Sequence, residues 1–215
     1  MLASGFVLVR TFSVGVMRVL AVPLVLVAFH GSSQPLPAPL RAELVAAHLW
    51  HPGCPAALSQ LRLLTVSYHG FDGRTHTGQL VVNAAAAPPL LAVFRRLYEL
   101  HFPIRQMQPL HPSGDDTAAF ECRDAAPSPC PGSPPTGHWS EHAYGEAVDI
   151  NPIENPYTGC GRTSERASIP YLNRSVLRPG MVTPAVVAAF ASVGWGWGGN
   201  WTGTQDYMHF SATGH

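Results

Sequence analysis

The chain has 215 residues, of which 46% are hydrophobic and 12% are charged. This composition leaves room for one ordinary domain with a real core plus an extension, and it excludes disorder over most of the length. The formal net charge is zero, which argues against nucleic acid as a partner, because phosphate binding requires a basic face.

The N-terminus has the pattern of an export signal. Two arginines precede an apolar run at 19–29, and a small, polar and Pro-rich segment follows at 31–39. The apolar run of about 11 residues is shorter than the roughly 20 residues that a membrane span needs. We therefore expect residues 1–33 to direct the protein out of the cytoplasm. An uncleaved membrane anchor is the alternative, and Met17 is an alternative start.

The first half of the chain alternates between helical and strand patterns. Apolar residues at helical spacing predict helices, and short runs rich in Leu, Val and Thr predict strands. In chain order, we expect a linker at 35–39, a helix at 40–50, a strand at 61–68, a turn at 70–73, a strand at 79–83, a helix at 90–100 and a strand-like segment at 102–110. The first two strands are predicted to form a hairpin.

The second half is dominated by segments crowded with proline and glycine. In chain order, we expect a surface loop at 125–137, a strand at 148–150, a long loop at 151–180, a helix at 185–193, a Gly/Trp segment at 194–200 and a final strand at 207–210. Loops this long usually form functional walls. The mixture lacks βαβ regularity and therefore predicts an α+β fold with a small antiparallel sheet and flanking helices. After residues 1–33, we expect an extension with a hairpin at 34–84 and a catalytic core at 85–215.

The four cysteines are Cys54, Cys122, Cys130 and Cys160. An even number behind an export signal predicts two disulfides, and the lack of a C-x-x-C spacing argues against a cysteine zinc site. Three connectivities are open. We favour Cys130 with Cys160, because both lie in Pro- or Gly-rich loops, and this leaves Cys54 with Cys122.

One stretch of the chain offers metal ligands. His142 and Asp149 are seven positions apart, and Gly145 between them permits a tight chain path. His209 offers a third ligand, and Asp206, three residues before it, is free to act as a base. A catalytic zinc takes three such ligands and leaves its fourth position to water. Spacing alone is equally consistent with ordinary polar residues, and no H-E-x-x-H motif is present.

The paired motifs Ser140-x-His142-x-x-Gly145-x-Ala147-x-Asp149 and Asp206-x-x-His209 decide between these interpretations. They resemble the zinc peptidases of the D-alanyl-D-alanine carboxypeptidase (VanY/VanX-type) family. That family includes phage endolysins that cut L-alanyl-D-glutamate bonds, and it shares its metal core with lysostaphin-type and hedgehog domains. The resemblance runs from about residue 102 to the end, and the Gly/Trp segment is similar to that of exported actinobacterial members.

The resemblance implies a zinc ion held by three side chains and served by a carboxylate base. The expected ligands are His142, Asp149 and His209. The expected base is Asp206, because a carboxylate beside the metal can accept a proton from water. Glu141 and Glu146 are the alternative bases.

The resemblance also implies residues that bind the substrate. Arg123 precedes the first motif, as does an arginine that holds a substrate carbonyl or carboxylate in the family, and Arg105 is the alternative. Ser140 is expected to hydrogen-bond the substrate or a ligand, with a role as a turn hydroxyl as the alternative. The tryptophans of the last 25 residues are expected to pack on the sheet, with glycan stacking as the alternative.

Together these points predict an exported, zinc-dependent peptidase that hydrolyses peptidoglycan stem peptides as D-alanyl-D-alanine carboxypeptidases do. The protein is expected to be secreted or associated with the cell envelope and monomeric, with transient membrane association through its N-terminal segment. The alternatives are an L-alanyl-D-glutamate endopeptidase of the same family, a non-catalytic zinc-containing binding module, and a disulfide-held surface domain without metal.

Overall fold

The computed structural model describes residues 28–110 and 114–215, so residues 1–27 of the expected export segment lie outside the described residues. The helices are α1 (Ala38–Ala46), α2 (Ala87–Glu99), α3 (Glu141–Tyr144) and α4 (Pro184–Ala191), with the 3-10 helices η1 (Arg166–Tyr171) and η2 (Gly198–Asn200). The strands are β1 (Gly31–Pro35), β2 (Leu61–His69), β3 (Thr75–Asn83), β4 (Ala147–Asp149), β5 (Tyr157–Gly159), β6 (Gly196–Trp197), β7 (Thr204–Asp206) and β8 (His209–Ser211). Across both described ranges, every helix falls short of the length and apolar character that crossing a bilayer requires.

The predicted α+β class is confirmed by three small antiparallel sheets with helices between and beside them. The first sheet has the order β1–β2–β3, and β2 and β3 form the expected hairpin, with Leu61 opposite Asn83. Successive side chains of a strand point to opposite faces. Leu63 therefore joins the core under α1, whereas Leu64 and Val66 join the larger core under α2.

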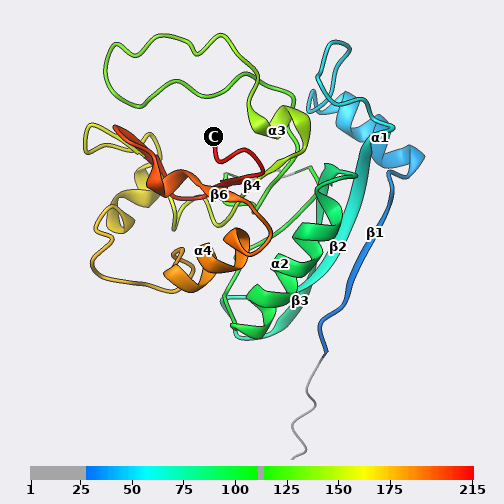
Figure 1. Cartoon of the computed structure of the whole chain (residues 1–215), viewed down its shortest axis with the longest axis horizontal. Helices are drawn as coiled ribbons and strands as arrows, with labels where there is room; N and C mark the ends of the chain where they lie inside the picture. Colours follow the sequence, from blue (N-terminus) through cyan, green and yellow to red (C-terminus); the bar gives the residue numbers. More distant parts are fainter. Residues whose placement is uncertain (1–27, 111–113) are drawn as a thin grey trace, which may run out of the picture.

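Helix α2 joins the two halves of the fold. Its buried residues, among them Leu90 and Phe94, belong to the same core cluster as Phe190 of α4 and Phe210 of β8. The rings of Phe190 and Phe210 are stacked with centroids 3.8 Å apart. In Figure 1, α2 accordingly lies between the β1–β2–β3 sheet and α4. This core fixes β8, the strand that carries His209.

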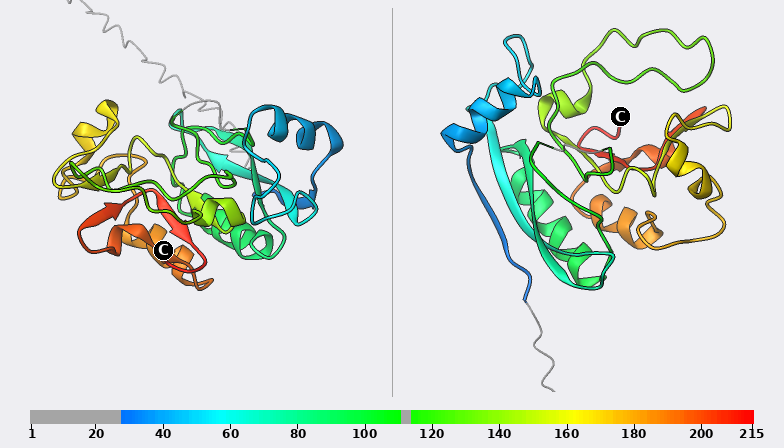
Figure 2. Two further views of the ribbon diagram at one scale, coloured as in Figure 1. Left: turned by 90° about the horizontal axis from the view of Figure 1, so that it is seen from above. Right: turned by 180° about the vertical axis from the view of Figure 1, so that it is seen from behind.

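The two remaining sheets bring the distant motifs together. The sheet β4–β8–β6 pairs Asp149 with His209, and the sheet β5–β7 pairs Tyr157 with Asp206. Both sheets lie away from α1 and β1, next to the segment that contains η1, as the two views of Figure 2 show.

The segment at 31–39 is not the extended tail and linker that we expected. Residues Gly31–Pro35 form β1, which pairs along its whole length with β2, and α1 begins at Ala38. Four of the five β1 residues are exposed. An edge strand of this kind is held by main-chain hydrogen bonds, so its sequence carries no alternation of apolar residues that would reveal it.

Two further expectations about secondary structure are wrong. The segment at 102–110 is not a strand: it makes only isolated bridges, such as His69 with Pro103. Prolines at 103 and 109 remove main-chain donors, which explains why a ladder does not form there. The segment at 151–180 is not one continuous loop, because it contains β5 and η1. The helix at 185–193 is present as α4, although the Thr183 side chain makes no capping hydrogen bond.

All four cysteines of the sequence form disulfides, in the pairing that we favoured. Cys54 is bonded to Cys122, and Cys130 is bonded to Cys160. The second bond ties the loop at 125–137 to the end of β5, whose last residue Gly159 lies close to Pro129. The loop is therefore anchored to the small sheet that carries Asp206.

Candidate metal centre

A single helical turn, α3, positions the first candidate ligand. Ser140 is its N-cap and accepts a hydrogen bond from the His142 backbone N–H, and Gly145 ends it with φ at 72°. The sequence patterns predicted no element here, since four residues are too few to show helical periodicity. The expected role of Gly145 is confirmed. A Cβ at this position would also lie 2.7 Å from the Asn83 nitrogen, so glycine permits both the turn and the close contact.

The other two candidate ligands face each other across a strand pair. Asp149 on β4 stands directly opposite His209 on β8. Val148 and Ile150 are fully buried on the other side of β4, which confirms the predicted alternation. Side chains opposite each other on neighbouring antiparallel strands are close neighbours, so this register alone brings two members of the site together.

The three side chains converge on one point with equal spacing. The His142 Nε2, His209 Nδ1 and Asp149 Oδ1 atoms are all 3.2 Å from one another. Zinc ligands at about 2.0–2.1 Å on the corners of a tetrahedron would lie about 3.3–3.4 Å apart. The residues present therefore fit a zinc ion bound through two imidazoles and one carboxylate.

The outer nitrogens of both imidazoles have backbone oxygen partners. His142 Nδ1 lies 2.5 Å from the Ala119 oxygen, and His209 Nε2 lies 3.1 Å from the backbone oxygen of His215. A backbone oxygen only accepts, so these nitrogens carry the hydrogens and the inner nitrogens carry lone pairs. Two nitrogen lone pairs then face each other beside the Asp149 carboxylate, an arrangement that a bound cation would stabilise.

Protons compete for the same atoms. Burial alone would raise the pKa of Asp149, but the nearby imidazoles His142 and His209 outweigh it and lower this pKa. Burial alone would lower the pKa of His209, but Asp149 outweighs it and raises this pKa. A proton therefore binds this cluster readily when no metal is present, and metal affinity should fall at acidic pH.

Asp206 lies beside the cluster on β7. Its Oδ1 atom is buried and has no hydrogen-bond partner among the described residues. Burial, followed by the negative charge of Asp149, raises the pKa of Asp206 to about 7, although Arg123 and His209 act in the opposite direction. A carboxyl with such a pKa can both accept and return a proton near neutral pH.

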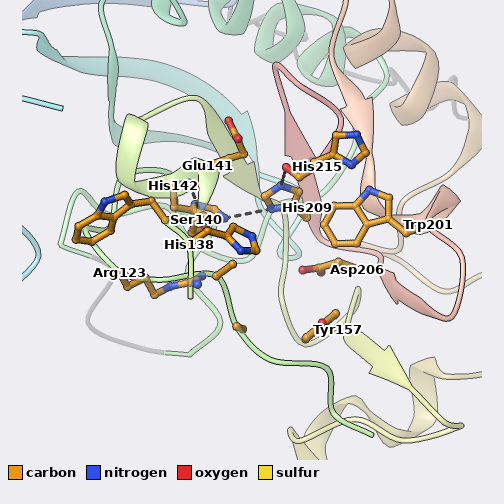
Figure 3. Close-up of a pocket in the computed structure, with 13 residues that line it drawn as sticks. Arg123, His138, Ser140, Glu141, His142, Tyr157, Trp201, Asp206, His209 and His215 are labelled. Atoms are coloured by element: carbon orange, nitrogen blue, oxygen red, sulfur yellow. Dashed lines mark hydrogen bonds between the residues drawn. The ribbon is translucent and has the colours of Figure 1, made fainter. Parts of the chain in front are cut away.

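A cavity of about 210 Å³ opens over the cluster. In Figure 3, the side chains of Arg123 and His138 lie across this cavity from that of Asp206. It is lined by Arg123, Ala125, Ala126, His138, Trp139, Ser140, Glu141, His142, Tyr157, Trp201, Asp206, His209 and His215.

A second cavity of about 220 Å³ shares the side chains of Arg123 and His142 with the first. It also includes Asp149, Glu121 and Asp116. The candidate metal ligands therefore lie between two hollows of similar size.

Comparison with known proteins points to one family. Residues 134–212 match the family model of D-alanyl-D-alanine carboxypeptidases. No curated protein and no solved structure shows significant similarity to the chain. The matched residues extend from the loop before α3 to the segment after β8, so they include the three candidate ligands and Asp206. The match supports a metallopeptidase, and the cluster is a site that could hold its metal.

The structure brings one of the two expected substrate-binding arginines to this site. Arg123 lines both cavities and forms an ion pair with Glu121 at 2.8 Å. Arg105 is not brought there: its guanidinium forms ion pairs with Asp115 and Glu154, and it lines neither cavity. Position in the chain could not separate these two arginines, because both precede the first motif.

Of the other residues expected near the site, some line the first cavity and others do not. Ser140 lines the first cavity while it caps α3, so both interpretations of its hydroxyl fit the structure. Glu141 reaches the same cavity, but its carboxylate points away from the imidazoles in Figure 3, and Glu146 does not line it. Trp197 packs against Phe210, as expected for the sheet.

The sequence did not assign Tyr157 or His215 to the cavity, and glycan stacking was only the alternative for Trp201. Tyr157 lies in a segment expected to be loop, and its pairing with β7 is not visible in the sequence. Trp201 was expected to pack on the sheet, but its ring tilts against His209 at the cavity. His215 carries no signal of its own, since only the backbone turn after β8 brings it back to His209.

A second group of metal-ligating types has a different explanation. His51, Cys54 and Cys122 lie close together, with His51 Nε2 3.4 Å from the Cys122 sulfur. Both sulfurs belong to one disulfide and are therefore not thiolates. This agrees with the expectation from cysteine spacing that zinc is not held by cysteine.

Proposed function

We propose that this protein is an exported, zinc-dependent peptidase that hydrolyses peptidoglycan stem peptides in the manner of a D-alanyl-D-alanine carboxypeptidase. The observation that carries the proposal is the equal 3.2 Å spacing of His142 Nε2, His209 Nδ1 and Asp149 Oδ1. These atoms lie within the stretch that matches the family model, beside a buried carboxyl with a pKa of about 7.

In this proposal, His142, Asp149 and His209 hold the zinc. A bound zinc ion would polarise the substrate carbonyl and lower the pKa of a water molecule toward about 7. Asp206 accepts the proton of the attacking water and later donates it to the leaving amine, because its raised pKa permits both steps near neutral pH. Its unpartnered, buried Oδ1 supports this role.

Arg123 is proposed to bind the substrate. Its side chain is about one-third exposed and lines both cavities, and an arginine can form two parallel hydrogen bonds with a carboxylate. It would stabilise either the developing oxyanion or the terminal carboxylate of a stem peptide. The Ser140 hydroxyl would add a hydrogen bond from the same wall of the cavity.

An endopeptidase that cuts L-alanyl-D-glutamate bonds is the second candidate. Two hollows flank the candidate ligands and share Arg123 and His142, so a peptide could extend in both directions from the scissile bond. Mass spectrometry of the products from one defined pentapeptide muropeptide separates the candidates. Release of D-alanine supports the carboxypeptidase, and release of a fragment that begins with D-glutamate supports the endopeptidase.

A non-catalytic zinc module is a third candidate. Such a module has no need for a buried base, so the presence of Asp206 beside the ligands favours catalysis. Protein that contains zinc but leaves every muropeptide intact would support the module. Export is supported by the two disulfides, which form in oxidising compartments.

A further inference from the structure

The two imidazoles of the metal centre are supported differently. Each needs an acceptor for its outer N–H so that its inner nitrogen can bind metal. For His142 the acceptor is the backbone oxygen of Ala119, a residue of the buried core. For His209 the acceptor is the backbone oxygen of His215, at the end of a short segment that follows β8.

That segment, residues 212–215, is folded back by a set of hydrogen bonds. Ser211 Oγ, on a fully buried residue, donates to the His215 oxygen at 2.8 Å and accepts from the Gly214 N–H at 3.1 Å. Trp201 Nε1 donates to the Gly214 oxygen at 2.7 Å. The His215 oxygen thus receives bonds from both Ser211 and His209, although the residue as a whole is exposed.

Two glycines permit this return of the chain. Gly214 has φ at 81°, which residues with a side chain rarely adopt. Gly196 on β6 faces it so closely that an added Cβ would lie 2.5 Å from the Gly214 Cα. The backbone of 212–215 therefore packs directly on the sheet that carries His209.

We propose that the backbone oxygen of His215 is a positioning group for the metal centre: it holds His209 in the tautomer whose Nδ1 faces Asp149 and His142. This inference rests on the proposed zinc site. It adds that tight zinc binding requires the backbone oxygen of His215. The group acts through His209 and touches neither metal nor substrate. Loss of such an outer hydrogen bond typically lowers metal affinity by about 10- to 100-fold.

Four variants distinguish the effect of the backbone oxygen of His215 from the effects of other features of segment 212–215. Deletion of Gly214 and His215 removes the oxygen, and Gly214→Val displaces it, since a β-branched residue disfavours a φ of 81°. His215→Ala keeps the oxygen and removes only the imidazole. Ala212→Val is the control for the added side chain, because Ala212 lies in the same segment and is exposed.

The test is the zinc affinity of each purified protein, measured by competition with a chromophoric chelator, together with the visible absorption spectrum after cobalt substitution. We expect the first two variants to bind zinc about 10- to 100-fold more weakly with an altered cobalt spectrum, and the last two to stay within about threefold of wild type. If the deletion variant does not fold, the zinc affinity and cobalt spectrum of Gly214→Val decide whether the inference holds.

Equal affinity in all four variants would overturn the inference and leave the proposed function intact. An equal loss in His215→Ala would overturn it as well, because the imidazole would then be the group that matters. A wild-type protein that binds no zinc would instead contradict the proposed function itself.

Discussion

Asp149 Oδ1 and His209 Nδ1 lie 3.2 Å apart because their residues stand opposite each other on β4 and β8. One strand register thus joins two motifs that are 60 residues apart in the sequence. The remaining candidate ligand, His142, comes from the helical turn that leads into β4.

Replacement of Asp149 by alanine should abolish stoichiometric zinc binding. The change removes one of three ligand atoms, so we expect the zinc affinity to fall by more than about 100-fold, beyond the usual effect of losing an outer partner. Zinc content after dialysis measures this. Asp124→Ala is the matched control, because Asp124 is an exposed carboxylate that lines neither cavity at the candidate ligands. Equal zinc content in both variants would rule out Asp149 as a ligand.

Replacement of Asp206 by asparagine should lower kcat/KM by about 100- to 10,000-fold, the usual contribution of a positioned acid or base. Zinc content should stay near that of wild type, because Asp206 is not one of the three converging residues. Glu146→Gln, which changes a carboxylate outside the cavity, is the control and should stay within about threefold. Full activity of the Asp206 variant would place the base elsewhere.

The rate should rise with pH. Asp206 must be ionised to accept a proton, so activity is present above its pKa and is lost as pH falls through it. That pKa is about 7 without metal, and the positive charge of a bound ion would lower it, so the limb of kcat/KM should lie at or below about pH 7.

The position of this limb in the pH profile of kcat/KM should depend on Arg123. Its positive charge lowers the pKa of Asp206, so Arg123→Gln should shift the limb to higher pH, and Arg123→Lys should restore it. A pH profile of kcat/KM for the three proteins measures this. An unmoved limb in Arg123→Gln would show that another group titrates.

Protein stability should depend on Asp115 between about pH 4 and pH 6. Burial, followed by the negative charge of Glu154, raises the pKa of Asp115 to about 6. A carboxyl whose pKa is higher in the folded state stabilises that state at pH values below the unfolded-state pKa. This contribution to stability is lost as the pH rises through the folded-state pKa. The loss amounts to about 3 kcal/mol at most. Asp115→Asn should lack this slope in denaturant unfolding, and an unchanged slope would contradict the assignment.

Removal of the Cys130–Cys160 disulfide should affect both stability and substrate binding. Replacing both cysteines by serine frees a loop with a sequence separation of 30 residues, which should lower the free energy of unfolding by about 3–4 kcal/mol. The loop residues Ala125 and Ala126 line the cavity, so KM should rise as well. The Cys54–Cys122 pair is the control: its removal should lower stability by about 4 kcal/mol with less effect on KM.

Sequence patterns identified those parts of the fold that have a hydrophobic period. The alternation around Asp149, the hairpin of β2 and β3, and the amphipathic helix α2 were all predicted for this reason. Strands β1 and β5 were missed, because they are held by main-chain pairing and have no such period. The one-turn helix α3 was missed because it is shorter than the pattern that would reveal it.

Only part of the candidate site could likewise be predicted from the sequence. The ligand types and Asp206 follow from two short motifs whose residues can be found in the sequence. Tyr157 and the oxygen of His215 could not be found, because a register and a backbone turn place them at the site. The choice of Arg123 over Arg105 likewise required the ion pairs of Arg105 with Asp115 and Glu154.

The most direct test of a zinc peptidase at this site is hydrolysis of a defined pentapeptide muropeptide by three preparations of one protein: as purified, stripped of metal by a chelator, and reconstituted with one equivalent of zinc. We expect the first and third preparations to release D-alanine, detected by mass spectrometry, and the second to leave the muropeptide intact. Cleavage that survives complete removal of the metal, or an intact muropeptide in the presence of stoichiometric zinc, would contradict the account.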